Sequence, residues 1–401
     1  MYLRFNKITF LLPLFAACFA FSCGNQNTEK FPVEEILGNY HGIYFPEDQV
    51  QEQNFSVYLD YSSGVKTAFK DFNTQNFYQL FINSFKIQAV DFFQVSNSGI
   101  EKTVGLKTSE LLKKIKDSGK FKGENSMLGT AVKQIVDGNS AAVFITDGEL
   151  YAKGGADRAW AKDDFAKWLK KGNSIEFFIT DYIDGGKEKH LFYMCFVPKN
   201  SSSTAVSDFK SYLSISGTAK NMKYNYFYFY SSSPDMGYGY LSLSENWKTL
   251  FQKFSENNGI PLLNGIKLDL PQSACYKIGK IVLKTYNISD DFFRYKSTLS
   301  EATDTVFVPA KRLNEIENLF VLDGDNPYNE LNIRLSKNFS GSLSATGDNF
   351  FRIDFVLKDV SVDDENINAY SLTPSILGAL SAANPEGKTV YSYYVKTMAY
   401  D

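Results

Sequence analysis

The stretch VFITDGEL, residues 143–150, decides how this chain is interpreted. An apolar run leads into Thr146, and Asp147 and Gly148 follow directly. The pattern predicts a buried strand that ends on a hydroxyl, a carboxylate and a glycine. A plain loop can be built from many polar residues, whereas a hard cation at the mouth of a sheet requires oxygen ligands. We therefore expect one corner of a metal site here, with other segments supplying further ligands.

The segments around this stretch alternate between strand-like and helix-like patterns. Apolar strands are expected at 55–60, 86–95, 141–148, 174–181 and 190–198, and helical spacing of apolar residues at 76–85, 108–116, 126–136 and 163–173. Strands that alternate with helices predict crossover connections. Residues 51–200 are therefore expected to form an α/β domain with a doubly wound, mostly parallel, Rossmann-like sheet. In such folds ligands bind at the carboxyl ends of the strands.

Two further segments place side-chain oxygens near strand ends. LDYSSG (59–64) gives Asp60 and Ser62, and ENSMLGTA (124–131) places Ser126 before a helix. Their order and spacing resemble the von Willebrand factor A domain family and its metal-ion-dependent adhesion site. That family has Asp-x-Ser-x-Ser after the first strand, Thr before a Leu-x-x-Ala helix, and Thr-Asp-Gly after the fourth strand. The resemblance covers residues 50–198 and leaves the C-terminal half uncovered.

The resemblance implies a metal site formed by Asp60, Ser62, Ser126 and Asp147, with Mg²⁺ as the cation, or Ca²⁺ or Mn²⁺. Mg²⁺ takes oxygen ligands in octahedral geometry and keeps several waters, so hydroxyls suit it. The chain departs from the family pattern in two places. Ser126 stands where the threonine belongs and keeps the oxygen, whereas Gly64 stands where the second serine belongs, so one hydroxyl ligand is missing.

Simpler interpretations of these segments stay open. Asp-Gly is common in turns, so TDG and DYSSG each also fit an ordinary loop. The acidic segment TDYIDGG, with Asp181 and Asp184, fits either a Ca²⁺ loop or a hairpin turn, and we favour the turn. His41 and His190 are too few and too scattered for a zinc site.

The N-terminal segment resembles a bacterial lipoprotein signal. A short positive region precedes the apolar run ITFLLPLFAACFAF, and Cys23 follows it among small residues. The run is too short for a transmembrane helix. The resemblance implies that residues 1–22 are removed, that Cys23 carries lipids which anchor the chain to a membrane, and that residues 23–50 form a tether. An ordinary signal peptide, or lipidation at Cys18, are the alternatives.

Residues 201–401 are expected to form a β-rich C-terminal domain whose pattern fits a sandwich. Strand-like segments separated by turn signals dominate, and one helical pattern lies near 244–256. Cys195 and Cys275 are the two cysteines beyond the N-terminal segment. Export permits a disulfide between them, but the sequence leaves open whether they meet.

Composition narrows the classes of function. The chain has 401 residues, of which 44% are hydrophobic, so it can bury sizeable cores. Its net charge of -3, with Lys and Arg dispersed, argues against nucleic-acid binding. We expect an exported lipoprotein of the bacterial cell envelope, on the periplasmic or surface face, that binds a protein partner through the metal. The alternatives are a structural envelope lipoprotein without metal and a hydrolase. We do not expect an enzyme, because Ser62 lacks a Gly-x-Ser-x-Gly elbow.

Overall fold

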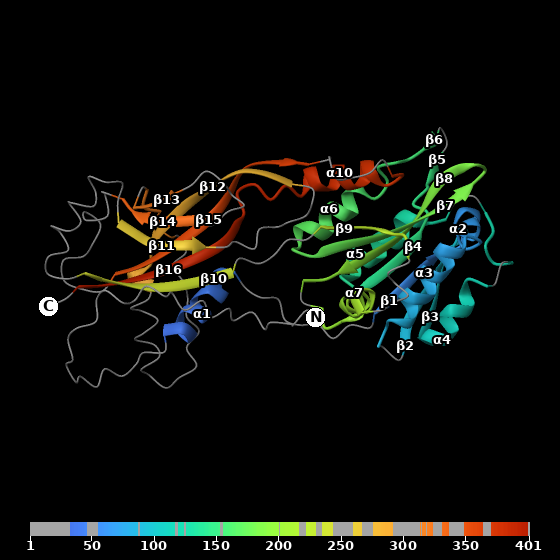
Figure 1. Ribbon diagram of the computed structural model, residues 1–401, viewed down its shortest axis with the longest axis horizontal. Helices are drawn as coiled ribbons and strands as arrows, with labels where there is room; N and C mark the ends of the chain where they lie inside the picture. The colour runs from blue at the N-terminus through green and yellow to red at the C-terminus, as the bar shows by residue number, and fades with distance from the viewer. Residues whose placement is uncertain are drawn as a thin grey trace.

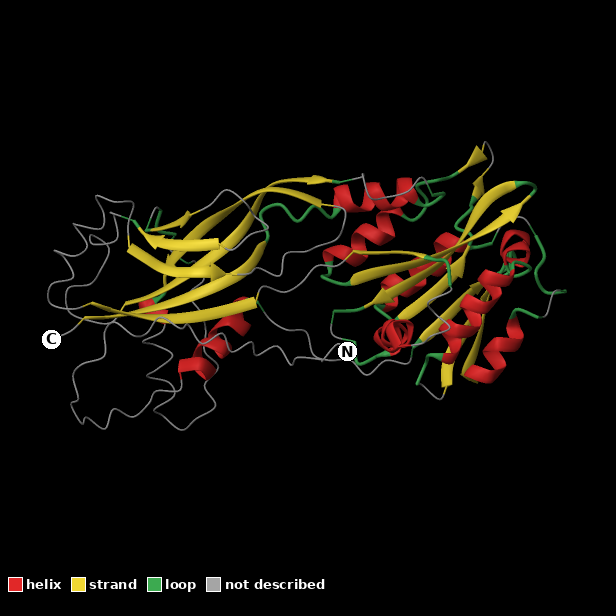
Figure 2. Ribbon diagram, viewed as in Figure 1, coloured by secondary structure: helices red, strands yellow, loops and turns green. Residues whose placement is uncertain are grey.

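The computed structural model divides the molecule into an α/β region and a β-rich region, which lie side by side along its long axis (Figure 1). Helices concentrate in the α/β region, whereas long strands build the other (Figure 2). The structure describes residues 33–45, 55–229, 235–243, 260–266, 276–291, 313–323, 331–336, 349–363 and 370–399, apart from short gaps at 87–88, 117–118, 124–125, 153–154, 200, 216–221, 314 and 318.

A seven-stranded sheet in the order β3-β2-β1-β4-β8-β7-β9 forms the centre of the α/β region. Its strands are β1 (Ser56–Asp60), β2 (Ala89–Val95), β3 (Ile100–Lys107), β4 (Ala142–Thr146), β7 (Ser174–Asp184), β8 (Lys187–Val197) and β9 (Asn225–Phe229). The middle strands β2, β1 and β4 are parallel, whereas β3, β8 and β9 run antiparallel to their neighbours. The fold class is therefore α/β with a mixed sheet.

The α/β class agrees with the sequence-based expectation, but the sheet is mixed rather than mostly parallel. β3 pairs antiparallel with β2, β9 pairs antiparallel with β7, and the β7–β8 hairpin adds two further antiparallel pairings. Gly185 and Gly186 connect the two strands with φ angles of 57° and 78°, which is the backbone that a tight two-residue hairpin needs. The hairpin returns β8 into the sheet between β4 and β7, antiparallel to both. The predicted hairpin turn in TDYIDGG is confirmed.

Helices cover both faces of this sheet, as expected from strands that are apolar on both sides. The helices of the region are α2 (Ser63–Ala68), α3 (Phe72–Asn83), α4 (Thr108–Lys114), α5 (Leu128–Gly138), α6 (Lys162–Lys170) and α7 (Ala205–Ile215). Val57 and Leu59 of β1 face the core that contains α3, and Tyr58 faces the core that contains α5 and α6. A two-stranded hairpin, β5 (Tyr151–Ala152) and β6 (Gly155–Ala156), follows β4.

Two sheets pack together in the β-rich region. One has the order β10-β16-β15-β12, with β10 (Asp235–Leu243), β16 (Thr389–Ala399), β15 (Asn349–Val362) and β12 (Tyr276–Asn287). The other has the order β11-β14-β13, with β11 (Ile260–Ile266), β14 (Leu331–Leu335) and β13 (Phe320–Asp323). Phe320 and Ile333 of the smaller sheet share one buried core with Phe351 and Ile353 of the larger sheet. The helix expected near 244–256 lies outside the described residues.

Three segments cross the boundaries that the sequence suggested. β9, from the aromatic stretch YNYFYFY, joins the α/β sheet beside β7 rather than the β-rich region. Helix α10 (Thr373–Ala382) follows the β-rich strands in the chain but packs against α6. Helix α1 (Val33–Tyr44) occupies part of the expected tether and packs against the β-rich region.

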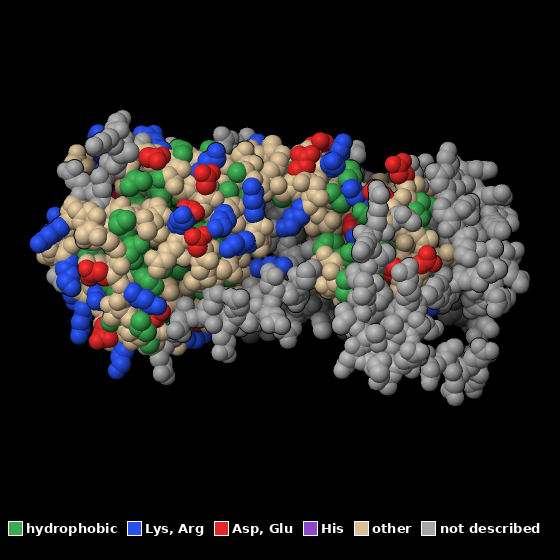
Figure 3. All heavy atoms as spheres, turned by 180° about the vertical axis from the view of Figure 1, so that it is seen from behind, with side chains coloured by type: hydrophobic (Ala, Val, Ile, Leu, Met, Phe, Trp, Pro, Cys, Tyr) green, Lys and Arg blue, Asp and Glu red, His purple; other side chains and the backbone are tan. Residues whose placement is uncertain are grey.

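Several expectations about the N-terminus and the cysteines concern residues without a described structure. Residues 1–32, with Cys23 and the expected signal, lie outside the described residues, and so does Cys275. Cys195 is a buried free thiol in β8, so it forms no disulfide here. Within the described residues, no helix has the length and apolar character that crossing a membrane requires. On the face of the α/β region in Figure 3, side chains of both charge signs are interspersed.

Candidate functional site

The candidate site lies where β1 and β4 end. These strands are parallel neighbours, so their carboxyl ends meet at one edge of the sheet. Asp60 is the last residue of β1, and Asp147 directly follows β4. From β1 the chain crosses to β2 on one side, while β4 pairs on the other side. Such a switch point is the usual ligand-binding position in an open α/β sheet.

Asp60 is fully buried and accepts hydrogen bonds on both carboxylate oxygens. Oδ1 accepts from the Ser62 backbone N–H at 2.8 Å and from the Ser126 hydroxyl at 2.5 Å. Oδ2 accepts from the Thr146 hydroxyl at 2.8 Å and from the Ser62 hydroxyl at 3.1 Å. Three hydroxyls from three separate segments therefore converge on one carboxylate.

The local backbone explains how Ser62 and Ser126 reach Asp60. Ser62 is the N-cap of α2, and its Oγ accepts a hydrogen bond from the Val65 N–H, which fixes the side chain at the start of the helix. The Met127 N–H donates to the Ser96 carbonyl oxygen at 3.1 Å, which ties the loop before α5 to the end of β2. Ser63 is exposed, as expected for the residue that points the other way.

Asp147 takes its position from the turn that follows β4. The Gly148 N–H donates to the Thr146 hydroxyl at 3.0 Å, and the Glu149 N–H donates to Asp147 Oδ1 at 3.2 Å. The other carboxylate oxygen points at α2: a Cβ built on Gly64 would lie 1.8 Å from Asp147 Oδ2. Gly64 therefore does more than omit a hydroxyl, because its lack of a side chain leaves the space that the Asp147 carboxylate fills.

The two carboxylates lie in an environment that disfavours their charged forms. Burial raises the pKa of Asp60, although its hydrogen bonds oppose the shift. Burial, reinforced by the neighbouring charge of Asp60, raises the pKa of Asp147 well above its usual range. A cation held between the two groups would offset both effects.

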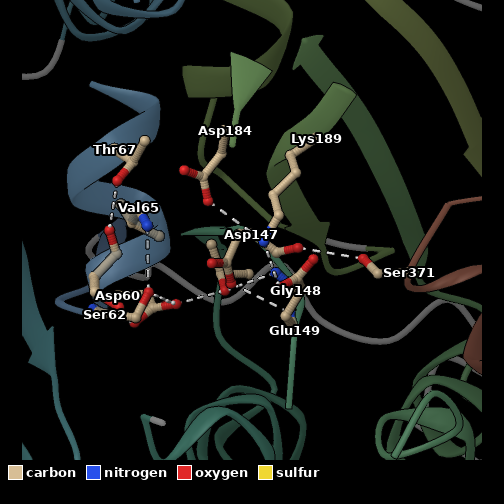
Figure 4. A network of polar contacts seen from close by, with 12 residues as sticks. Asp60, Ser62, Val65, Thr67, Asp147, Gly148, Glu149, Asp184, Lys189 and Ser371 are labelled. Atoms are coloured by element: carbon tan, nitrogen blue, oxygen red, sulfur yellow. Dashed lines mark hydrogen bonds and ion pairs between the residues drawn. The ribbon is translucent and has the colours of Figure 1, made fainter. Parts of the chain in front are cut away.

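Lys189 is a cation near this site. It reaches from the β7–β8 hairpin toward Glu149, at 3.1 Å from its carboxylate, and it lies 3.6 Å from Asp184 (Figure 4). Its charge lowers the pKa of Asp147 but is outweighed there by burial. Glu149 and Lys189 are each about a quarter exposed, so the polar rim of the site opens toward solvent.

The donor set fits a hard divalent cation. The Ser62 and Ser126 hydroxyls give their hydrogens to Asp60. Ser62 Oγ also accepts from the Val65 N–H, so one of its lone pairs remains for a metal, and Ser126 Oγ likewise has lone-pair capacity for one. Among the described residues, no group of three or more His, Cys, Asp and Glu side chains is placed to hold a metal ion. A cation here would rest on hydroxyls, two carboxylates and water, which is a Mg²⁺-like rather than a Zn²⁺-like ligand set.

A segment from the far end of the chain covers one side of the site. The Ser371 hydroxyl donates to the Asp147 carbonyl oxygen at 3.2 Å (Figure 4). Leu372 lies against Gly148, where an added Cβ would come within 2.8 Å of it. Gly148 has a φ of +67°, so both its backbone and this contact require glycine. Tyr370 packs edge-on against His190 with ring centroids 4.8 Å apart.

The structure brings all four predicted site residues together: Asp60, Ser62, Ser126 and Asp147. Thr146 was not predicted as a site residue, although the threonine of the TDG stretch was the available signal. Lys189 was not predicted either, because no local pattern shows that a hairpin will carry this residue to the end of β4. Thr130, one turn beyond Ser126, is exposed.

The acidic hairpin segment has other partners. Asp181 Oδ1 lies 2.8 Å from His190 Nδ1, which gives His190 a structural contact, and Asp184 pairs with Lys189.

Comparisons with known proteins add little to this geometry. No protein-family model matches the sequence, and a search of curated proteins finds no significant match. Among solved structures, the crystal structure of the pilus adhesin SpaC from Lactobacillus rhamnosus GG in the open conformation is similar at 9% identity, with a TM-score of 0.19. The match covers 78% of this chain, which spans only 42% of the adhesin chain. A TM-score this low supports no conclusion about fold or function.

Proposed function

We propose that this chain is an exported, lipid-anchored protein of the bacterial cell envelope that binds a protein partner through a divalent cation. Asp60, Ser62, Ser126 and Asp147 would hold the cation, and Mg²⁺ is the favoured ion, with Mn²⁺ or Ca²⁺ as alternatives. The order of these residues along the chain resembles that of the von Willebrand factor A domain family. The lipid anchor at Cys23 is proposed from the sequence alone.

One observation carries the proposal. Asp60 and Asp147 are both buried at the same sheet edge, and hydroxyls from α2 and from the loop before α5 point to that edge. Burying two neighbouring carboxylates is costly unless a positive charge accompanies them. Lys189 lies at the rim and pairs with Glu149, so a cation between the carboxylates would supply the missing compensation.

The bound cation would act as a positive centre that accepts an oxygen ligand from a partner. The residues of this chain would orient it and limit its access to water. Asp60 would hold the two serine hydroxyls in place by accepting their hydrogens. Asp147 would balance the charge of the cation, and the cation itself would favour an acidic group on the partner.

Titration calorimetry with Mg²⁺ and Mn²⁺ tests this function. The wild-type chain should bind one ion, and Asp147→Asn should bind it about tenfold or more weakly. Asp184→Asn is the matched control, since Asp184 lies on the nearby hairpin and pairs with Lys189. Equal affinity of Asp147→Asn and wild type would overturn the assigned site.

A second candidate is a structural envelope lipoprotein whose α/β region has lost the metal. Two observations favour it. Both oxygens of Asp60 already accept hydrogen bonds from the protein, and Gly64 removes one hydroxyl of the family pattern while the Asp147 carboxylate takes its space. Absence of calorimetric binding by the wild-type chain would favour this candidate.

A further inference from the structure

Helix α1 belongs structurally to the β-rich region. Leu37 and Tyr40 of α1 are buried in one cluster with Ile288, Phe350 and Tyr394. Ile288 directly follows β12, Phe350 lies in β15 and Tyr394 lies in β16. The segment that precedes the α/β domain in the sequence therefore packs on strands more than 240 residues later in the chain.

Polar contacts give this packing a defined register. The Tyr40 hydroxyl donates to Asp291 Oδ2 at 3.2 Å, and the Tyr44 hydroxyl donates to the same oxygen at 3.4 Å. His41 Nδ1 lies 3.0 Å from the Tyr394 hydroxyl. Tyr40, Asp291 and Tyr394 are all buried. Such contacts would be lost if the helix rotated or slid along the sheet.

Arg352 of β15 ties the end of α1 to the sheet. Its side chain is 6% exposed and donates to Asp354 Oδ2 at 2.7 Å, while Nε and Nη1 have no hydrogen-bond partner among the described residues. The guanidinium carbon lies 4.6 Å from the Tyr44 ring centroid, 5.3 Å from that of Phe45 and 4.9 Å from that of Tyr286. The rings of α1 and the residue after it thus cover a buried cation whose other groups are incompletely paired.

We propose that α1 clamps the N-terminal part of the chain to the β-rich region, so that this region stands next to the membrane. The orientation rests on the proposed lipid anchor at Cys23. Nine residues lie between Cys23 and Val33, and an extended chain spans at most about 35 Å between the two. In Figure 1, α1 lies under the β-rich region and α2, which begins beside Ser62, lies in the other half of the molecule. The sheet edge with Asp60 and Asp147 would then face a partner away from the bilayer.

Hydrogen exchange on the full chain in solution tests the clamp without any membrane. An isolated 12-residue helix is marginal in water, so an undocked α1 would exchange nearly like an unfolded peptide. We expect the amides of α1 to exchange at least about 100-fold more slowly than those of an unfolded peptide. Tyr44→Ala should remove most of this protection, and Tyr44→Phe, which keeps the ring over Arg352, should retain it. An unprotected α1 in the wild-type chain would overturn the clamp.

Energy transfer to labelled lipids tests the orientation. Donor dyes at Val321→Cys in β13 and at Ile183→Cys on the β7–β8 hairpin use exposed positions, in a Cys275→Ser background. With the lipidated chain in vesicles that carry acceptor lipids, transfer from position 321 should exceed that from 183 by about twofold or more, because transfer falls steeply with distance from the surface. Equal or reversed transfer would overturn the orientation.

Two controls separate this inference from the proposed lipid anchor. Mass spectrometry shows whether Cys23 carries lipid, and an unmodified Cys23 would refute the anchor. The transfer measurement is then repeated with a chain that is tethered to nickel-chelating lipids by a histidine tag placed just before residue 24. This measurement tests the clamp and the orientation whether or not Cys23 carries lipid.

Discussion

Asp147 and Gly64 are complementary: the carboxylate of one fills the space that a side chain on the other would need. A Cβ on Gly64 would lie 1.8 Å from Asp147 Oδ2 and 3.0 Å from its carboxyl carbon. The position of the Asp147 carboxylate therefore depends on glycine at position 64.

Replacing Gly64 by alanine or serine should destabilise the metal-free protein by about 1–3 kcal/mol, because the Asp147 carboxylate must move. Calorimetric unfolding in the presence of a chelator measures the loss. Gly129→Ala in α5 is the matched control, since the nearest atom to its Cβ would be 4.0 Å away and alanine favours a helix. Equal effects of the two substitutions would contradict the contact.

The contribution of Asp147 to the stability of the metal-free protein should fall as the pH rises from acid toward neutral. The folded-state pKa of Asp147 is raised, so the folded protein holds its proton more tightly than the unfolded chain. This contribution to stability is complete below the ordinary carboxyl pKa and is lost as the pH rises through the raised value. Melting curves in chelator across this range should decline for wild type relative to Asp147→Asn, and Mg²⁺ should restore wild type near neutral pH. If the stability of wild type and of Asp147→Asn changed with pH in the same way, the raised pKa of Asp147 would be contradicted.

Ser126→Ala should destabilise the α/β region by about 1.5–3 kcal/mol, because the change removes a buried hydrogen bond to the charged Asp60 carboxylate. Ser126→Thr keeps the hydroxyl and should retain both stability and metal affinity. Denaturation and metal titration of the two variants provide the measurements. Unchanged metal affinity of Ser126→Ala would remove Ser126 from the ligand set.

The contact between Gly148 and Leu372 should appear as energetic coupling. Gly148→Ala places a side chain at a φ of +67° and 2.8 Å from Leu372, so a loss of about 2 kcal/mol or more is expected. Leu372→Ala alone should cost about 2–5 kcal/mol through a buried cavity. The double variant should lose less than the sum of the two, because the second change relieves the clash. If the losses of the two single variants simply add in the double variant, the contact between Leu372 and Gly148 would be contradicted.

Local patterns predicted the α/β class and the elements β1, β4 and α5 at the site, but not helix α2, strand β3 or the strand order of the sheet. The apolar run before Thr146 and the helical spacing after Ser126 each follow from burial on regular structure. Strand β3 was not predicted, because most of its residues are exposed and its sequence IEKTVGLK shows no apolar periodicity. Helix α2 has six residues with only Val65 and Ala68 buried, which is too short for a periodic signal.

The other differences between the expected and the observed fold come from contacts between segments that are distant in the sequence. Strand order depends on which edges meet in space, so two good strand patterns could not reveal that β8 lies between β4 and β7. β9 and α10 are similarly placed by pairing and packing with residues far away in the chain. At the site itself, the sequence showed that Gly64 lacks a hydroxyl, but only the structure shows that Asp147 occupies that space.

The most direct test of the proposed cation site is a crystal structure of the protein grown with Mn²⁺, whose anomalous scattering identifies the ion. We expect a single strong peak at the carboxyl edge of β1 and β4, about 2.1–2.2 Å from the Ser62 and Ser126 hydroxyl oxygens, with Asp60 and Asp147 around it. A map without a peak at this edge at saturating Mn²⁺, with the Asp147 carboxylate still against Gly64, would contradict the proposed metal-dependent function.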